Sequence, residues 1–226
     1  MNQQLYQQIE NYMQECMTDS AHDKEHIYRV LFMALDIAKY EQQIDMEILI
    51  ISALLHDIGR EDQFKDPRLC HAKVGSEKAY EYLLRIGFNE KRADHIRECI
   101  YSHRFRSDNP PISIEAKILF DADKLDVTGT IGIARTLVYK GIVSDPMYSV
   151  DSDGHVLDGS NDAEASFFKE YKFKLENIYD KFYTDRGREI ASERKQSAVS
   201  FYEEMLKEVK NCYDNGEKEL SDILQN

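Results

Sequence analysis

The sequence predicts a nearly all-α protein, and three observations support this fold class. Only 10 Gly and 4 Pro occur in 226 residues, fewer than the many turns of a sheet protein need. Charged residues make up 31% of the chain, and apolar residues recur at the spacing of amphipathic helices. No Pro/Gly/Ser-rich linker divides the chain, so we expect one domain over residues 1–226.

The N-terminal elements are expected to be helices joined by short turns. Residues 3–17 form a short polar helix. The next helix has His26 in its first turn, and its candidate N-caps are Thr18, Asp19 and Ser20. Asp45 is expected to cap a third helix, and Gly59 to end it. The dipeptide His56-Asp57 therefore falls in the last turn of that helix, beside a loop.

The middle of the chain alternates loops and helices. Residues 60–70 are expected to form a loop, because Pro67 bars a simple helix. A helix over about 72–86 follows. The next helix starts after the N-cap Asn89, and His103 is the polar end of its apolar stripe.

Beyond the breaker NPPIS at 109–113, a helix starting near Ile114 places Asp123 beside a buried face. A further helix is predicted over residues 127–140. Its small residues would allow close helix approach: Gly129, Gly132 and Ala134.

The C-terminal third contains the one long polar irregular segment, residues 144–162, which we interpret as a mobile loop over the site. Two long helices are expected after it, over roughly 163–183 and 187–211, followed by a frayed tail.

The charge balance limits the partners of the protein. The net charge of −13 argues against binding of a nucleic-acid polymer, because phosphate contacts need a basic face. A small phosphorylated substrate can bind only if a metal ion and a few nearby cations make the electrostatic potential positive inside one cleft.

The cysteines and the apolar runs indicate a cytoplasmic protein without a membrane partner. The four cysteines are far apart, with no CxxC pair, and are expected to be reduced thiols: Cys16, Cys70, Cys99 and Cys212. The longest apolar run, ILIISALL at 48–55, is too short to span a bilayer.

Four dispersed side chains are the strongest functional pattern: His26, His56, Asp57 and Asp123. Taken singly, His26 is better explained as a surface or capping histidine, and Asp123 as a carboxylate paired with Arg or Lys. Jointly they favour one divalent cation, because buried carboxylates are costly without a positive charge. Imidazole and carboxylate suit Mn, Fe, Zn and Ni better than Mg or Ca alone. A metal held in this way, with positions left open, can activate water against a phosphate ester.

The residues around these four resemble a known family. His26-Ile-Tyr-Arg-Val, Leu-Leu-His56-Asp57-Ile-Gly and Asp121-Ala-Asp123-Lys-Leu-Asp126 are similar to the H…HD…D signature of HD-domain metal-dependent phosphohydrolases. CHAKVGSEKA and DADKLDVTGTIGIART resemble its bacterial branch of small stand-alone members, some of which are nucleotide pyrophosphohydrolases. The resemblance is close over about residues 19–140. The run TDRGREIASER, within the C-terminal helices at about 163–226, is similar to the tail of that branch.

The resemblance implies an HD-domain helical bundle with a C-terminal helical extension. It also implies that His26, His56, Asp57 and Asp123 are the metal ligands. The flanking acids Asp121 and Asp126 are then expected to orient ligand imidazoles and bound water.

Two further histidines have two open interpretations. His71 and His103 either bind a second ion, with Asp57 as a bridging carboxylate, or donate hydrogen bonds to a phosphate. Since neither brings negative charge, a second ion should be held more weakly than the first. The remaining histidines are expected to be structural or solvated: His22, His95 and His155.

Cations near the motifs are candidate phosphate contacts. Arg60, one step past HDIG, and Lys124, between two of the acids, are preferred because phosphate needs nearby positive groups. The others are Lys65, Lys73, Arg104 and Arg106. Arg188 and Arg194 fit a solvated helix face better than the cleft.

The expected reaction is hydrolysis of a phosphoester or phosphoanhydride. The resemblance favours cleavage of a nucleoside triphosphate to monophosphate and pyrophosphate. The alternatives are a nucleotidase, a cyclic-nucleotide phosphodiesterase and a non-catalytic nucleotide sensor. The expected cofactor is Mn, Fe, Ni, Zn or Mg, with Mn favoured, and a homo-oligomer remains open.

Overall fold

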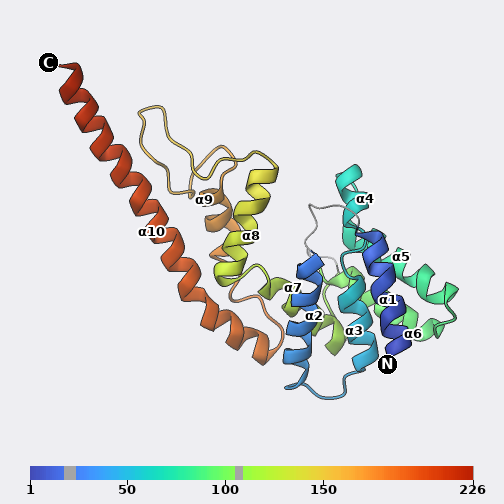
Figure 1. The fold of residues 1–226 in the computed structure, drawn as a ribbon. Helices are drawn as coiled ribbons and strands as arrows, with labels where there is room; N and C mark the ends of the chain where they lie inside the picture. Colours follow the sequence, from blue (N-terminus) through green and yellow to red (C-terminus); the bar gives the residue numbers. More distant parts are fainter. Residues whose placement is uncertain (18–23, 105–108, 226) are drawn as a thin grey trace. The chain divides into compact units, whose positions relative to one another are not determined.

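The computed structural model describes residues 1–17, 24–104 and 109–225, and its regular secondary structure there is helical (Figure 1). The predicted all-α fold is confirmed. The chain divides into two compact units, Met1–Asp126 with Phe182–Arg188, and Val127–Lys181 with Glu189–Asn226. The single domain expected over 1–226 stays a prediction. Among the described residues, no helix has the length and apolar character needed to cross a membrane.

The first unit begins with two helices of the expected type. Helix α1 (Gln3–Cys16) starts at Asn2, whose side chain accepts a hydrogen bond from the Leu5 amide at 2.8 Å. Helix α2 (Lys24–Ala38) has His26 in its first turn. The suggested caps lie outside the described residues: Thr18, Asp19 and Ser20.

Helix α3 (Met46–Leu55) carries the apolar run into the centre of the first unit. As predicted, Asp45 caps it, accepting hydrogen bonds from the amides of Glu47 and Ile48 at 3.1 and 3.2 Å. Seven of its ten residues are buried, as expected for a helix that is apolar on all sides. His56 and Asp57, which follow α3 directly, therefore lie at the centre of the packed helices.

The loop predicted at 60–70 is partly wrong, because residues Arg60–Lys65 form helix α4. Pro67 lies beyond this helix and limits only its continuation. Helix α3 ends at Leu55 with His56 as its C-cap, so the end expected at Gly59 is wrong and His56-Asp57 follow the helix; Gly59 is the N-cap of α4. A Cβ at Gly59 would lie 2.3 Å from the His71 carbonyl oxygen, so glycine is needed for the close approach of the next helix.

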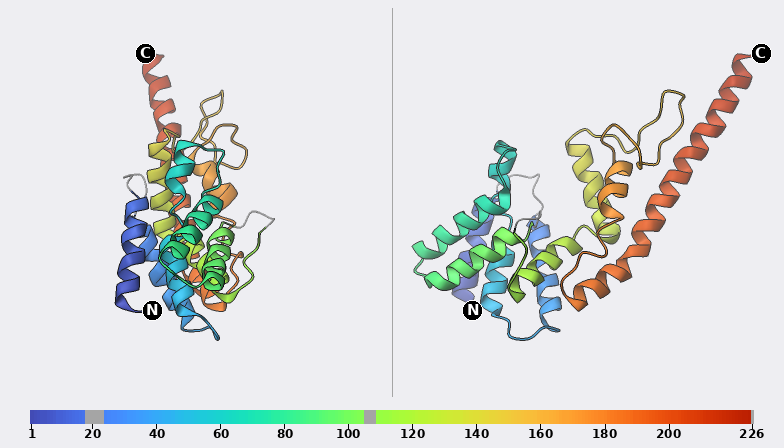
Figure 2. Two further views of the ribbon diagram at one scale, coloured as in Figure 1. Left: turned by 90° about the vertical axis from the view of Figure 1, so that its right-hand side faces the viewer. Right: turned by 180° about the vertical axis from the view of Figure 1, so that it is seen from behind.

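Three more helices complete the first unit: α5 (His71–Arg85), α6 (Glu90–Ser102) and α7 (Ile114–Leu125). The predicted cap Asn89 accepts a hydrogen bond from the Arg92 amide at 3.2 Å. Helices α5 and α6 lie side by side (Figure 2), while α2 packs on α7 and α3 on α6. These contacts place the starts of α2 and α5 and the ends of α3, α6 and α7 near one another.

In the second unit, the first residue of helix α8 (Gly129–Ile142) lies close to the long helix α10 (Asp185–Leu224). Gly129 has φ +61°, and a Cβ there would lie 2.9 Å from Arg194 Cβ. Gly129 therefore allows the close helix approach that was predicted, whereas Gly132 faces the backbone of Val127, where a Cβ would lie 2.3 Å from the carbonyl oxygen. Helix α10 continues well past residue 211, so the frayed tail expected there is wrong.

The long helix predicted over 163–183 is also wrong. The chain forms only a short helix α9 (Phe167–Glu170) and a single π-helical turn, Tyr171–Leu175. Apolar residues at helical spacing are buried here by tertiary contacts, such as the stacking of Tyr171 on Tyr202 with ring centroids 4.0 Å apart. Residues 144–162 are irregular as expected, apart from one bridge between Val150 and Val156. A role for this segment over the site stays a prediction.

Candidate metal centre

Three helices of the first unit bring together three of the four predicted ligands. His26 from α2, His56 after α3 and Asp123 from α7 offer atoms that lie within 4.8 Å of one another. His26 Nε2 is 3.3 Å from Asp123 Oδ1 and 3.4 Å from His56 Nε2. The His56 side chain is fully buried, whereas that of Asp123 is 25% exposed. This first cluster therefore reaches solvent on the Asp123 side.

Asp57 lies between this first cluster and a second one. Its Oδ2 is 3.5 Å from His26 Nε2 and 3.6 Å from His56 Nε2. Its Oδ1 is 3.5 Å from both His71 Nε2 and His103 Nε2. The second cluster is thus Asp57, His71 and His103, all buried. One carboxylate serves both groups, one oxygen to each.

The hydrogen bonds fix the tautomer of each imidazole. Every Nδ1 faces an oxygen acceptor: Asp126 Oδ2 for His26 (2.7 Å), the Ala53 carbonyl for His56 (2.8 Å), Gln63 Oε1 for His71 (2.8 Å) and the Ile100 carbonyl for His103 (2.5 Å). Because an acceptor needs a proton, neutral rings carry it on Nδ1. All four Nε2 lone pairs then face the carboxylates, which is the usual arrangement of metal-binding histidines.

The second cluster contains acceptors that are buried close together. His71 Nε2 and His103 Nε2 take part in no hydrogen bond among the described residues, and Asp57 Oδ1 beside them has an ion pair with Arg60 Nε at 2.9 Å. Burying acceptors against one another without a donor is costly, and a divalent cation is the group that satisfies both imidazoles and the carboxylate at once. The residues of both clusters therefore fit a metal ion.

The protonation states agree with this interpretation. Burial lowers the pKa of His56 to about 4 and that of His71 to about 2, so both rings are neutral at pH 7 and able to bind metal. Burial also lowers the pKa of His26, but hydrogen bonds to Asp123, Asp126 and Asp57 outweigh it and raise this pKa to about 10. The carboxylates thus favour a positive charge at this point of the fold.

The comparisons with known proteins fit this geometry. Residues 24–128 match the HD domain family. YpgQ of Bacillus subtilis is 31% identical over 209 residues, which are 90% of this chain and 93% of YpgQ. The chain belongs to the HD-domain family.

Solved HD-domain structures show the same fold. The crystal structure of B. subtilis YpgQ in complex with ADP has a TM-score of 0.70 at 28% identity, covering 90% of this chain and 97% of that one. An HD superfamily hydrolase from an uncultured Thermotogales bacterium has a TM-score of 0.61 at 30% identity, with 89% and 91% covered. One from Bacillus thuringiensis has 0.68 at 27%, with 91% and 97% covered. The resemblance seen in the sequence is confirmed at the level of family and fold.

The two flanking acids of the HD domain lie in different surroundings. Asp126 holds His26 and is itself held by Arg29, whose Nε donates to Asp126 Oδ1 at 2.7 Å. Asp121, also expected to orient a ligand, instead accepts hydrogen bonds from the Thr184 amide and hydroxyl, both at 2.7 Å, and from the Tyr183 amide. Its carboxylate therefore fixes the Phe182–Arg188 segment within the first unit.

The preferred phosphate contacts are near the clusters but already engaged. Arg60 Nε lies 2.9 Å from Asp57 Oδ1, an ion pair at the oxygen that faces the second cluster. Lys124 Nζ lies over the ring of Phe120, 4.3 Å from its centroid. Arg60 thus touches a predicted ligand directly, which the sequence did not indicate. The phosphate role of both residues stays a prediction.

The other candidates are placed as follows. Lys65 pairs with Glu61 at 2.5 Å, Lys73 is exposed, and Arg104 hydrogen-bonds Cys70. His95 lies 3.2 Å from Glu115, and His155 is exposed beside Asp151. Arg188 is exposed and donates to the Phe182 carbonyl, while Arg194 packs on Gly129. Two candidates lie outside the described residues, His22 and Arg106.

Two supporting residues were also missed by sequence reasoning: Arg29, which holds Asp126, and Gln63, which holds His71. Arg29 stands in the quoted motif three residues after His26, on the same face of α2, and this spacing was an available signal. Gln63 gave no such signal, because its segment was expected to be a loop. Its contact with His71 depends on helix α4.

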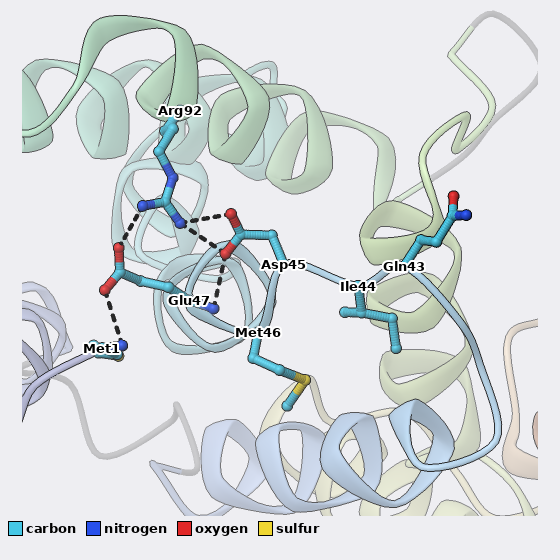
Figure 3. A pocket seen from close by; sticks show the side chains of 7 residues that line it. All are labelled: Met1, Gln43, Ile44, Asp45, Met46, Glu47 and Arg92. Carbon is cyan, nitrogen blue, oxygen red and sulfur yellow. Dashed lines mark hydrogen bonds and ion pairs between the residues drawn. The ribbon is translucent and has the colours of Figure 1, made fainter.

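A pocket elsewhere in the first unit is a poorer candidate for the functional site (Figure 3). Its seven lining residues include none of the two clusters: Met1, Gln43, Ile44, Asp45, Met46, Glu47 and Arg92. Its charged groups pair with one another, Arg92 with Asp45 at 2.7 Å and with Glu47 at 2.8 Å. The two clusters, with their unsatisfied buried acceptors, are the better site.

Proposed function

We propose that this HD-domain protein is a metal-dependent phosphohydrolase that acts on nucleotides. The observation that carries the proposal is the pair of clusters around Asp57, in which imidazole nitrogens and carboxylate oxygens converge and His71 Nε2 and His103 Nε2 are buried without a donor. Such a set suits a divalent cation, and the favoured ion is Mn²⁺ because of the mixed imidazole and carboxylate ligands. Family membership supports a hydrolytic reaction.

The favoured substrate is a nucleoside triphosphate, cut to monophosphate and pyrophosphate. The complex of YpgQ with ADP supports a nucleotide as the ligand class. In this reaction water adds across the α–β anhydride, so that the α-phosphorus gains the oxygen of water and pyrophosphate leaves. A cytoplasmic location is part of the proposal, since all four cysteines are free.

Separate residues are proposed to bind the ion and to contact the phosphate. His26, His56, Asp57 and Asp123 would hold the ion, which when bound supplies an activated water and offsets the charge on phosphoryl oxygens. The 25% exposed side of Asp123 is where substrate and water reach the cluster. Lys124 and Arg60 are proposed to contact phosphate oxygens and stabilise the charge that develops there.

Two rivals remain. The first is a nucleotidase or a cyclic-nucleotide phosphodiesterase. Two ions held at full occupancy before substrate is added would favour the phosphodiesterase, because two ions can stabilise both the attacking and the leaving oxygen. A non-catalytic nucleotide sensor is less well supported, because Asp123 leaves the first cluster open to solvent and a pure binder has less need of that opening.

One experiment separates these functions. Mn²⁺-loaded protein is incubated with nucleoside tri-, di- and monophosphates and with cyclic nucleotides, and the products are resolved by chromatography. Equal amounts of monophosphate and pyrophosphate from a triphosphate support the proposal. Orthophosphate from monophosphates indicates a nucleotidase, and ring opening of cyclic substrates a phosphodiesterase. Nucleotide binding without any product would indicate a non-catalytic sensor. Asp57→Asn protein is the control for contaminating hydrolase activity.

A further inference from the structure

Gln63 of α4 links the turn before α5, at Leu69, to His71 of the second cluster. Its Oε1 lies 2.8 Å from His71 Nδ1, and its Nε2 donates to the Leu69 carbonyl at 2.8 Å. Both contacts use one half-buried side chain. The amide is thus held at both ends, by the backbone on one side and by the imidazole on the other.

The Leu69 contact determines the orientation of the amide. A carbonyl oxygen can only accept, so the amide nitrogen must face Leu69 and the amide oxygen must face His71. His71 therefore carries its proton on Nδ1, and its Nε2 lone pair faces Asp57 Oδ1 at 3.5 Å. Gln63 in this way fixes both the tautomer and the direction of one imidazole of the second cluster.

His71 differs from the other three imidazoles in the kind of group that holds it. His56 and His103 donate to backbone carbonyls, which are set by their own helices. His26 donates to the charged Asp126. Only His71 depends on a neutral side chain, which makes the imidazole a weaker electron donor than a carboxylate partner would.

From this contrast we infer that Gln63 is a positioning residue that sets the affinity of the second cluster for a divalent cation. Its neutral amide keeps that affinity below the affinity of the first cluster. The inference rests on the proposal that both clusters hold cations. It concerns binding and not catalysis, because Gln63 touches only His71 among the ligands.

The test is a Mn²⁺ titration of the full chain, with free Mn²⁺ measured by electron paramagnetic resonance. Wild type is expected to bind one ion tightly and a second more weakly. Gln63→Leu, of similar size without the acceptor, should weaken only the second ion, by about 10- to 100-fold. The neighbouring exposed change Phe64→Leu is the matched control and should alter neither ion.

A second variant separates positioning of His71 from bracing of the loop. Gln63→Glu keeps an acceptor for His71 but loses the donor to Leu69. Restored or tighter binding of the second ion supports the inference. Binding as weak as in Gln63→Leu would overturn it, since the Leu69 contact alone would then matter.

The remaining outcomes distinguish this inference from the proposed function. Two wild-type ions that are both unchanged in Gln63→Leu would overturn the inference and leave hydrolysis standing. A single ion in wild type would also overturn it. Two ions with the expected response, in a protein that releases no product from any nucleotide, would refute the enzyme and keep Gln63 as the positioning residue.

Discussion

Asp57→Asn should weaken metal binding at both clusters, because each carboxylate oxygen faces one of them. Asn has nearly the same shape but carries no charge. Loss of a charge-assisted contact costs about 1.5–3 kcal/mol, which corresponds to about 10- to 150-fold in the dissociation constant. The second cluster should lose more, because Asp57 is its only carboxylate, whereas the first keeps Asp123.

Thermal unfolding gives a direct measure of this loss. An ion at 100 times its dissociation constant stabilises the folded state by about 2.7 kcal/mol. For a chain of this length, 1 kcal/mol is about 2–4 °C, so Mn²⁺ should raise the wild-type Tm by roughly 5–11 °C. A 10- to 150-fold weaker site leaves about 0.3–1.4 kcal/mol at the same concentration.

The metal-free variant supplies a second, independent observation. The substitution removes the carboxylate charge that pairs with Arg60 Nε at 2.9 Å, so Asp57→Asn protein in EDTA should be less stable than wild type even without metal, and the Mn²⁺ response is measured as the increase in Tm of each protein over its own EDTA value. Asp66→Asn, at a surface carboxylate paired with Arg68, is the control and should keep the full Mn²⁺ response. An undiminished Tm increase in Asp57→Asn would refute the role of Asp57 as a shared ligand.

Three further predictions follow from the same geometry. The pKa of His26, raised to about 10, means that the stability from its proton is complete below pH 6.5 and lost as pH rises through 10; the Tm of metal-free protein should fall over this window, and a rise would contradict the assignment. Lys124→Ala and Arg60→Ala should retain Mn²⁺ but lower kcat/KM about 10- to 150-fold, from about 1.5–3 kcal/mol per contact; wild-type kinetics would make them bystanders. Gly59→Ala should destabilise the fold by about 1–3 kcal/mol in denaturant unfolding, because its Cβ would meet the His71 carbonyl at 2.3 Å, whereas Gly216→Ala, with open space, should not.

The parts of the site that the sequence predicted are those fixed by local rules. Asp45 and Asn89 cap their helices through bonds two or three residues away, and such contacts are encoded locally. The joint occurrence of histidines with two carboxylates beside apolar segments indicated a cation, because charge cannot be buried alone. Whether these side chains meet depends on packing, and the structure brings His26, His56 and Asp123 together.

The failures arise where distant contacts decide the local structure. Apolar residues in 163–183 recur like those of a helix, but tertiary contacts such as the edge-to-face contact of Phe168 with Tyr202 bury them around a short helix and one π-helical turn. In 60–70, Pro67 was given too much weight, although it constrains mainly the residues next to it. Helix α4 was missed for that reason, and Gln63 with it.

The charge balance around Asp57 determines how the two clusters work together. The first cluster has two carboxylates and can neutralise a divalent ion, whereas the second shares one of them and adds only neutral imidazoles. Arg60 already pairs with the Asp57 oxygen that faces the second cluster. The positive charge of Arg60 therefore weakens the attraction of the second cluster for a cation further. A second ion then gains most when an anionic phosphate is present to balance both it and Arg60. Occupancy of the second cluster should therefore follow the arrival of a phosphorylated substrate, which would couple substrate binding to completion of the metal centre.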